Sequence, residues 1–169
     1  DDYLTPSCIG KRVEMIEKRQ DLDFLVFPSA VYINDVFEPH APEDIFGYDV
    51  HGDDLKGFAR RELPFIVWSN IYRAASIKKA NLTWDTQLLS LQDADFNLKA
   101  IMAGLRYDYA HVAPDYGYRI RHNQGSVSAN ICSSEHFKSN LYASAKFFEL
   151  FQGHYGHRYD KYVFQGVMR

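Results

Sequence analysis

The sequence has few cysteines, and this scarcity limits the classes of protein to which it can belong. Only two occur in 169 residues, Cys8 and Cys132, and they are far apart in the chain. Small secreted domains that depend on disulfides carry many more, and zinc sites need short-spaced pairs. We therefore expect two free thiols, buried in a protein of the reducing cytoplasm.

Long apolar runs are also missing. No stretch has the length needed to cross a bilayer, and no segment has the basic, apolar and small-residue regions of a signal peptide. We expect no membrane span in this chain. The sequence opens on DDYLTP without a methionine, so it can be a piece of a longer protein whose targeting segment lies upstream.

Neither sign of charge dominates. There are 19 Lys and Arg against 22 Asp and Glu, a net charge of −3, and no long basic stripe, so we expect no nucleic-acid partner. Apolar residues are abundant at 46%, with 12 Tyr and 12 Phe. This composition excludes a disordered chain and supports a domain with a hydrophobic core.

The predicted elements run in the order helix, strands, loop, strand, helix, helix, strands, helix. Thr5 and Pro6 begin a helix whose apolar face would carry Ile9, Val13 and Ile16. Strands are predicted in DLDFLVFP, AVYINDV, FIVWSNIY, LRYDYAHV and GYRIRH. Residues 37–54 indicate a long surface loop, and LKGFARREL and RAASIKKA indicate short helices. The order indicates an α/β or α+β fold without the regular alternation of a complete doubly wound sheet.

Two further helices are predicted with clearer signals. One begins after Ser90 and stops at Gly104, with Phe96, Ala100 and Ala103 on a shared face. The other runs from about Ser134 to Gln152 and ends at Gly153. Its apolar side would carry Phe137, Leu141, Phe148 and Phe151.

The segment LQDADF places carboxylates where the first of these helices begins. Asp93 and Asp95 are two residues apart, so on a helix they point about 200° away from each other and cannot flank one glycosidic bond. Asp93 alone fits two roles. It can complete an S-x-x-D capping pattern with Ser90, or act as an ionised base held at the positive end of the helix dipole.

Three other groups of residues each allow more than one interpretation. Asp1 and Asp2 suit Mg²⁺ or Mn²⁺, or simply favour the following helix dipole. Arg119 and Arg121, with the neighbouring His122, could contact a diphosphate or form a solvated strand edge. His154 and His157 have a metal-like spacing but lack the further ligands of a zinc signature, which indicates a structural role.

The order of the motifs carries more information than any one of them. DDYLTP, DLDFLVFPSAVYIND, PFIVWSNIYRAASI, LSLQDADFNLKAIMAGLRYDYA and DYGYRIRHNQGSVS, in this order, resemble the second half of a family 2 inverting glycosyltransferase. The resemblance runs from Asp1 to about Ser128. It implies an α/β fold, the C-terminal portion of a Rossmann-like GT-A domain, in which helices flank a mixed sheet and the first nucleotide-binding half is absent. Residues 1–130 would be the acceptor-side half and residues 131–169 a C-terminal helical extension.

The resemblance also implies roles for the acidic segments. Asp1 and Asp2 match the end of the D-x-D motif that binds a divalent cation, Mg²⁺ or Mn²⁺ in the complete enzyme. Gln92 and Asp93 match the family's E-D pair, in which the aspartate is the general base. Glutamine stands here where glutamate is usual, which removes one charge beside the base.

The remaining implied site residues bind the two substrates. Trp68 and Arg73, together with Gln92, would line the acceptor side. The basic residues that would approach the donor diphosphate are Arg119, Arg121 and His122.

The resemblance thus implies transfer of a sugar from a nucleotide-sugar donor to a saccharide or lipid-linked acceptor, with inversion, in cell-surface polysaccharide synthesis. We expect a cytoplasmic protein, free or peripherally associated with the inner face of the membrane, and a chain that is inactive without its nucleotide-binding half. The alternative is a non-catalytic, glycosyltransferase-like interaction domain. Lost activity would then explain Gln92.

Overall fold

The computed structural model describes residues 3–33, 36–38, 41–42, 45–120 and 133–168. Within these ranges the chain forms two sheets, with helices packed on both faces of one of them. Asp1, Asp2, Arg121 and His122 from the predicted site lie outside the described residues, as does Cys132.

A three-stranded mixed sheet forms the centre of the molecule. Its order is β5 (Asn70–Tyr72), β2 (Phe24–Val26) and β6 (Tyr107–Tyr109), with β2 parallel to β6 and antiparallel to β5. The carboxyl ends of parallel strands meet at one edge of a sheet, where α/β proteins bind their ligands. We call this the carboxyl edge. The chain leaves β2 and β6 there, and it enters β5 at the same edge.

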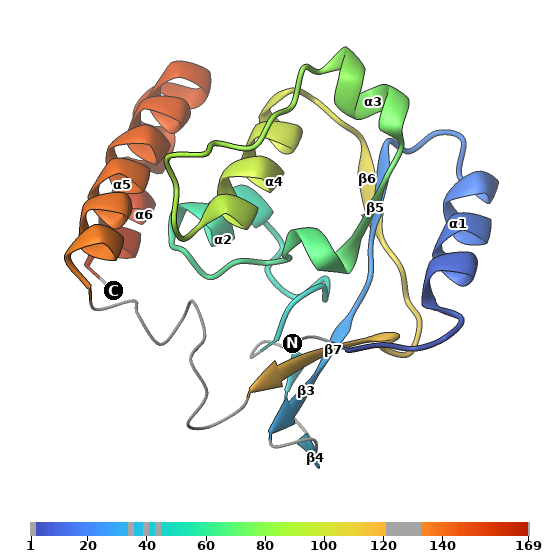
Figure 1. The fold of residues 1–169 in the computed structure, drawn as a ribbon. Coiled ribbons are helices and arrows are strands. Elements are labelled where there is room, and N and C mark those ends of the chain that lie inside the picture. The colour runs from blue at the N-terminus through green and yellow to red at the C-terminus, as the bar shows by residue number, and fades with distance from the viewer. Residues whose placement is uncertain (1–2, 34–35, 39–40, 43–44, 121–132, 169) are drawn as a thin grey trace.

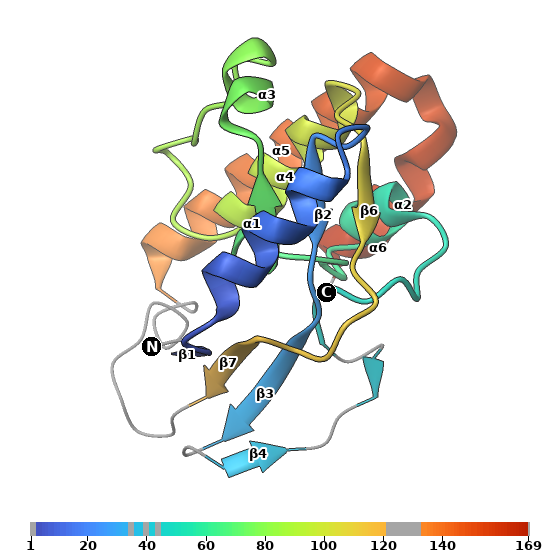
Figure 2. The same ribbon diagram turned by 90° about the vertical axis from the view of Figure 1, so that its right-hand side faces the viewer.

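A four-stranded sheet continues from the carboxyl edge (Figure 2). Its order is β1 (Tyr3–Leu4), β7 (Tyr116–Ile120), β3 (Ser29–Ile33) and β4 (Val36–Glu38). Strand β3 follows β2 after two residues, and β7 follows β6 after a short connection. Strands β3 and β7 are parallel, so the two central strands of this sheet extend the parallel pair of the first sheet.

Helices cover both faces of the three-stranded sheet (Figures 1 and 2). Helix α1 (Cys8–Lys18) lies on one face. On the other face lie α2 (Asp54–Ala59) and α4 (Gln92–Met102), and behind them α5 (Ser134–Tyr155) and α6 (Asp160–Val167) form an outer layer. The predicted fold class is confirmed, since the sheet is mixed and flanked by helices.

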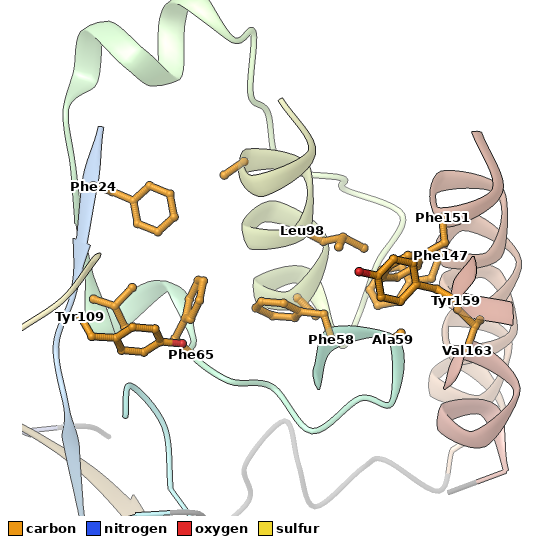
Figure 3. Close-up of a cluster of buried hydrophobic side chains, with 13 residues drawn as sticks. Phe24, Phe58, Ala59, Phe65, Leu98, Tyr109, Phe147, Phe151, Tyr159 and Val163 are labelled. Atoms are coloured by element: carbon orange, nitrogen blue, oxygen red, sulfur yellow. The ribbon is translucent and has the colours of Figure 1, made fainter. Parts of the chain in front are cut away.

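One large apolar core joins the sheet to the outer helices (Figure 3). Phe24 and Phe65 lie at the sheet, Leu98 of α4 lies in the middle, and Phe147 and Phe151 face them from α5. A smaller apolar cluster lies under α1. It contains Ile16, Leu22, Leu25, Phe27 and Ala110.

The predicted apolar face of α1 is correct for Ile16 and wrong for its other two residues. Ile9 and Val13 are 62% and 38% exposed, whereas Cys8, Arg12 and Ile16 are buried one helical turn apart. The apolar pattern did not predict the burial of Arg12, because its guanidinium is buried through an ion pair with Asp115, which lies far along the chain. Cys8 is a free buried thiol, as predicted, and its burial raises its pKa.

Most of the predicted helices are confirmed, with shifts at their ends. LKGFARREL contains α2, RAASIKKA contains α3 (Ala74–Lys79), and α4 stops before Gly104, whose φ is 76°. Helix α5 continues past Gly153 and ends at Tyr155, before Gly156, where φ is 58°. The turn η4 (Gly156–Tyr159) and helix α6 that follow it were not predicted. Among the described residues, no helix is both long and apolar enough to cross a membrane.

The segment FIVWSNIY is only partly the buried strand that its composition predicts. A short 3-10 helix, η2 (Val67–Ser69), occupies its middle, and β5 takes only its last three residues. The irregular turn brings Trp68 to the carboxyl edge, directly before β5.

Candidate functional site

Helix α4 begins with an unusual backbone that places Asp93 in its first turn. The N-cap residue, Leu91, has a φ of 63°, a left-handed conformation that costs a residue with a side chain roughly 1–2 kcal/mol. Leu91 itself makes no side-chain capping hydrogen bond. The buried hydroxyl of Ser90 has no hydrogen-bond partner among the described residues, so the predicted S-x-x-D cap is wrong.

Asp93 keeps the environment that favours an ionised carboxylate. It is half-buried in the first turn, where free backbone N–H groups and the positive end of the helix dipole lie. Gln92, the first residue of α4, is also half-buried. The helix start therefore fixes the position of Asp93 without the Ser90 hydroxyl.

Asp95, which the sequence separates from Asp93 by one residue, has a different environment. Its side chain is 1% exposed, and it forms ion pairs with Lys99 at 2.8 Å and with Lys146 at 2.6 Å. Two ammonium groups at these distances compensate the buried charge. Asp95 is thus an internal structural carboxylate, and its role differs from the one open to Asp93.

Asn97 connects α4 to the segment that enters β5. Its side chain is fully buried and donates to the Phe65 carbonyl at 3.2 Å, while its Oδ1 accepts from Asn70 at 3.0 Å and from the Tyr72 hydroxyl at 2.6 Å. Residues four apart lie on the same side of a helix. Asp93 therefore lies one turn before Asn97, on the side of α4 that packs against η2.

Trp68 is the exposed aromatic residue of η2. Its side chain is 60% exposed, and its backbone carbonyl accepts a 2.8 Å hydrogen bond from the buried Arg12 guanidinium. The backbone is thus fixed while the indole faces solvent. An exposed indole beside a helix start suits the stacking of a flat, partly apolar ligand face.

Arg73 lies at the opposite end of β5 and does not join this group. Its guanidinium donates to the backbone carbonyls of Leu22, Ile16 and Arg19. Because β5 runs antiparallel to β2, it carries the chain from the carboxyl edge to the other edge of the sheet. The structure therefore separates Arg73 from Trp68. The backbone contacts of Arg73 show that it anchors the C-terminal end of α1.

A pocket of about 300 Å³ also opens at the carboxyl edge. Strands in a sheet are about 4.8 Å apart, so the chain leaving β6 and the chain entering β5 are separated by about 10 Å across β2. The pocket begins on the β6 side of that gap. It is lined by Pro28, Gly47, Tyr48, Asp49, Tyr109, Ala110, His111, Val112 and Ala113.

One wall of this pocket requires glycine. Gly47 has a φ of 84°, and a Cβ at this position would lie 2.0 Å from the Phe27 carbonyl oxygen. The hydroxyl of Tyr48 donates to the Ser29 carbonyl at 3.1 Å, which holds the next residue in place. Asp49 and His111 are exposed at the pocket and give it a carboxylate and an imidazole for a polar ligand.

The predicted basic segment is described only in part. The backbone of Arg119 lies in β7, paired with Tyr32 of β3 in the four-stranded sheet. Arg121 and His122 lie outside the described residues, and so do the predicted metal ligands Asp1 and Asp2. Among the residues that the structure does describe, no group of three or more acidic, histidine or cysteine side chains could hold a metal ion.

Sequence reasoning missed Asn97 and Arg12 and left the role of Asp95 open, although all three hold the site together. Asn97 and Asp95 lie on the buried side of α4, and Arg12 lies on the buried side of α1. Each is a polar residue within an apolar pattern, which is the signal that could have identified them. Their partners lie far away in the sequence and could not be identified from it.

Comparison with known proteins supports the fold more than the chemistry. No protein-family model matches the chain, and no curated protein matches it. Among solved structures, the fold of this chain is similar to that of part of a glycosyltransferase.

One of the solved structures that match is S. aureus TarS, residues 1–349, in complex with UDP-GlcNAc. The TM-score is 0.65 at 18% sequence identity, and the match covers 99% of this chain and 45% of the TarS chain. This chain therefore spans less than half of the structure that it matches. At this identity the likeness establishes the fold, and any activity must be argued from the site.

Proposed function

We propose that the chain is the acceptor-side part of an inverting glycosyltransferase that uses a nucleotide-sugar donor. The observation that carries the proposal is the position of Asp93 in the first turn of α4, at the same edge of the sheet as the exposed Trp68. The fold shared with TarS, whose structure contains UDP-GlcNAc, supports the class of donor.

In the proposed reaction, Asp93 accepts the proton of an acceptor hydroxyl. The oxygen of that hydroxyl attacks the anomeric carbon of the donor from the face opposite the diphosphate. The new glycosidic C–O bond forms as the bond to the diphosphate breaks, so the configuration inverts in one displacement. A base in this role needs placement more than an altered pKa, because the hydroxyl becomes acidic during the attack.

The acceptor sugar would stack on Trp68, and Gln92 would hydrogen-bond to it at the helix start. A longer acceptor would reach the pocket beside Asp49 and His111, about 10 Å across the sheet edge. The proposed acceptor is a saccharide or a lipid-linked molecule. We place the reaction in cell-surface polysaccharide synthesis, in the cytoplasm or at the inner face of the membrane.

The donor side of the proposal depends on residues outside this edge. Arg119, Arg121 and His122 would contact the diphosphate, and Asp1 and Asp2 would bind Mg²⁺ or Mn²⁺. The cation would supply charge neutralisation of the diphosphate. A nucleotide-binding half preceding Asp1 completes the proposed enzyme, and we expect the chain without it to be inactive.

The test is Asp93→Asn in the full-length protein. We expect turnover in sugar transfer to fall at least about 100-fold, the usual scale for removing a general base, while the Kd for the donor is unchanged. Asp21→Asn is the control, since Asp21 is an exposed carboxylate at the opposite edge of the sheet. Full activity of the Asp93→Asn protein would exclude Asp93 as the base. Donor binding without transfer in the wild type would favour the non-catalytic interaction domain.

A further inference from the structure

Helix α5 holds the segment that precedes and begins α4. Ser139 of α5 accepts a 2.8 Å hydrogen bond from the backbone N–H of Leu89, just before the helix start. Lys146, two turns further along α5, contacts Asp85 at 2.6 Å and Asp95 at 2.6 Å. Contacts from one helix thus reach both ends of residues 85–95, the segment that contains Asp93.

This segment needs such support because its backbone is strained. Leu91 has a left-handed φ of 63°, and as the N-cap residue of α4 it makes no side-chain capping hydrogen bond. A strained conformation of this kind persists only where the surrounding structure determines it strongly, and such conformations cluster at functional sites. The buried Leu88 and the hydrogen bond at Leu89 fix the chain before the strained residue. The ion pairs of Asp95 fix the helix after it.

The ion pairs form a chain of alternating charges. Tyr142 donates to Asp85 at 3.0 Å, Lys146 lies between Asp85 and Asp95, and Lys99 pairs with Asp95 and donates to the Thr83 carbonyl at 2.7 Å. Lys146 is the one member that bridges α5 to both sides of the strained residue. Its side chain is 20% exposed, so water competes little with these contacts.

We propose that Lys146 is a positioning residue for Asp93, and that α5 is part of the catalytic apparatus rather than only a cover for the core. Lys146 holds the first turn of α4 through Asp95, two residues from the base, and holds the preceding loop through Asp85. The effect of this role on kcat rests on the proposed function, in which Asp93 is the base. The anchoring itself can be measured without any activity.

The first experiment measures amide hydrogen exchange in the full-length protein. Lys146→Met should speed exchange in residues 89–96, while the sheet residues of β2 and β6 keep their protection. Lys138→Met is the matched control, because Lys138 lies on the same helix with its side chain in solvent. Unchanged exchange in residues 89–96 of the Lys146→Met protein would overturn the inference, whether or not the wild type transfers sugar.

The second experiment separates positioning from stability. With UDP-GlcNAc as the donor probe, or another nucleotide sugar that the wild type uses, kcat per folded molecule should fall about 10- to 100-fold in Lys146→Met, the scale expected for displacing a catalytic group. The donor KM should stay unchanged, and Lys146→Arg should recover part of kcat. A merely structural role would lower the melting temperature but leave kcat per folded molecule unchanged, and that result would overturn the inference.

A second variant and a readout that needs no activity keep the test of the anchoring separate from the test of the proposed function. If Lys146→Met does not fold, Asp85→Asn tests the same link, since it removes one partner of Lys146 but leaves Asp95 paired with Lys99. Faster exchange in residues 85–91 of that variant is expected, and unchanged exchange would overturn the inference. Absence of transfer by the wild type with every nucleotide sugar would overturn the proposed function alone, and the exchange result would still decide the anchoring.

Discussion

Trp68 is the residue whose exposure is explained most directly by a ligand. We predict that Trp68→Ala raises the KM for the acceptor about 3- to 10-fold, the range expected for losing one aromatic contact. Its indole is 60% exposed, so the melting temperature should change little. Acceptor-dependent kinetics and a thermal melt of the same preparation check both parts.

A second tryptophan provides the control for this prediction. Trp84 is 48% exposed, but its ring stacks on Phe96 of α4 with centroids 4.7 Å apart. Trp84→Ala should therefore lower stability and leave the acceptor KM near its wild-type value. If Trp68→Ala lowered stability while the KM stayed constant, Trp68 would be a packing residue and not a ligand contact.

Residue by residue, the sequence identified candidates for chemistry better than it identified their supports. Asp93 and Trp68 were singled out from their motifs, and the structure brings them to one edge of the sheet. Asn97, which ties α4 to the segment containing Trp68, was not identified. Its place within an apolar pattern marks it as unusual but does not reveal its partners, since the carbonyl of Phe65 lies 32 positions away in the chain.

At the scale of single elements, periodicity predicted where helices form more reliably than which side they bury. Helix α5 illustrates this. Phe148 is half-buried and Phe151 is buried, but Phe137 and Leu141 on the same predicted side are 62% and 53% exposed. The C-terminal half of this side is covered by η4 and α6, neither of which was predicted. The face that a helix buries depends on its neighbours as well as on its own pattern.

The docking of α5 on the loop before α4 should depend on pH. The ammonium of Lys146, which hydrogen-bonds to Asp85, lowers the pKa of that carboxyl to about 2. An aspartate in an unfolded chain has a pKa of about 3.9. A lowered folded-state pKa gives a stabilisation that is present above about pH 4 and is lost as the pH falls toward 2.

We therefore predict that Asp85→Asn is less stable than the wild type above about pH 4, and that the two proteins converge near pH 2. Urea unfolding of both proteins between pH 2 and pH 6 measures the difference in their free energies of unfolding. All other carboxylates are present in both proteins, so their contributions cancel in this difference. Lys146→Met should lose the same pH-dependent component. A stability difference that stayed constant across this range would show that the Asp85 carboxylate gains nothing from Lys146 in the folded state.

At the scale of the whole molecule, the order of motifs predicted the class of fold but not how its two sheets are joined. The mixed sheet and the flanking helices follow from the order of strands and helices. The pairing of β3 with β7 does not, because residues 29–33 and 116–120 have no sequence signal that links them. A buried ion pair between α1 and the connection from β6 to β7 lies at the junction of the two sheets.

Arg12 of α1 is the centre of this junction. Its Nε donates to the Asp115 carboxylate at 3.0 and 3.2 Å, its Nη2 contacts the same carboxylate, and its Nη1 donates to the Trp68 carbonyl at 2.8 Å. The side chains of Arg12 and Asp115 are only 4% and 12% exposed. Helix α1, the connection from β6 to β7, and η2 therefore meet at one guanidinium.

We predict that Arg12→Met lowers the free energy of unfolding by about 3–5 kcal/mol, because the Asp115 carboxylate is left buried without its partner. The double variant Arg12→Met, Asp115→Leu should recover part of this loss, since it removes the uncompensated charge. Arg19→Met is the control. Arg19 also pairs with two aspartates, but its side chain is 43% exposed, so its loss should change the free energy of unfolding much less. Equal losses for Arg12→Met and Arg19→Met in urea unfolding would show that the junction does not depend on the buried pair.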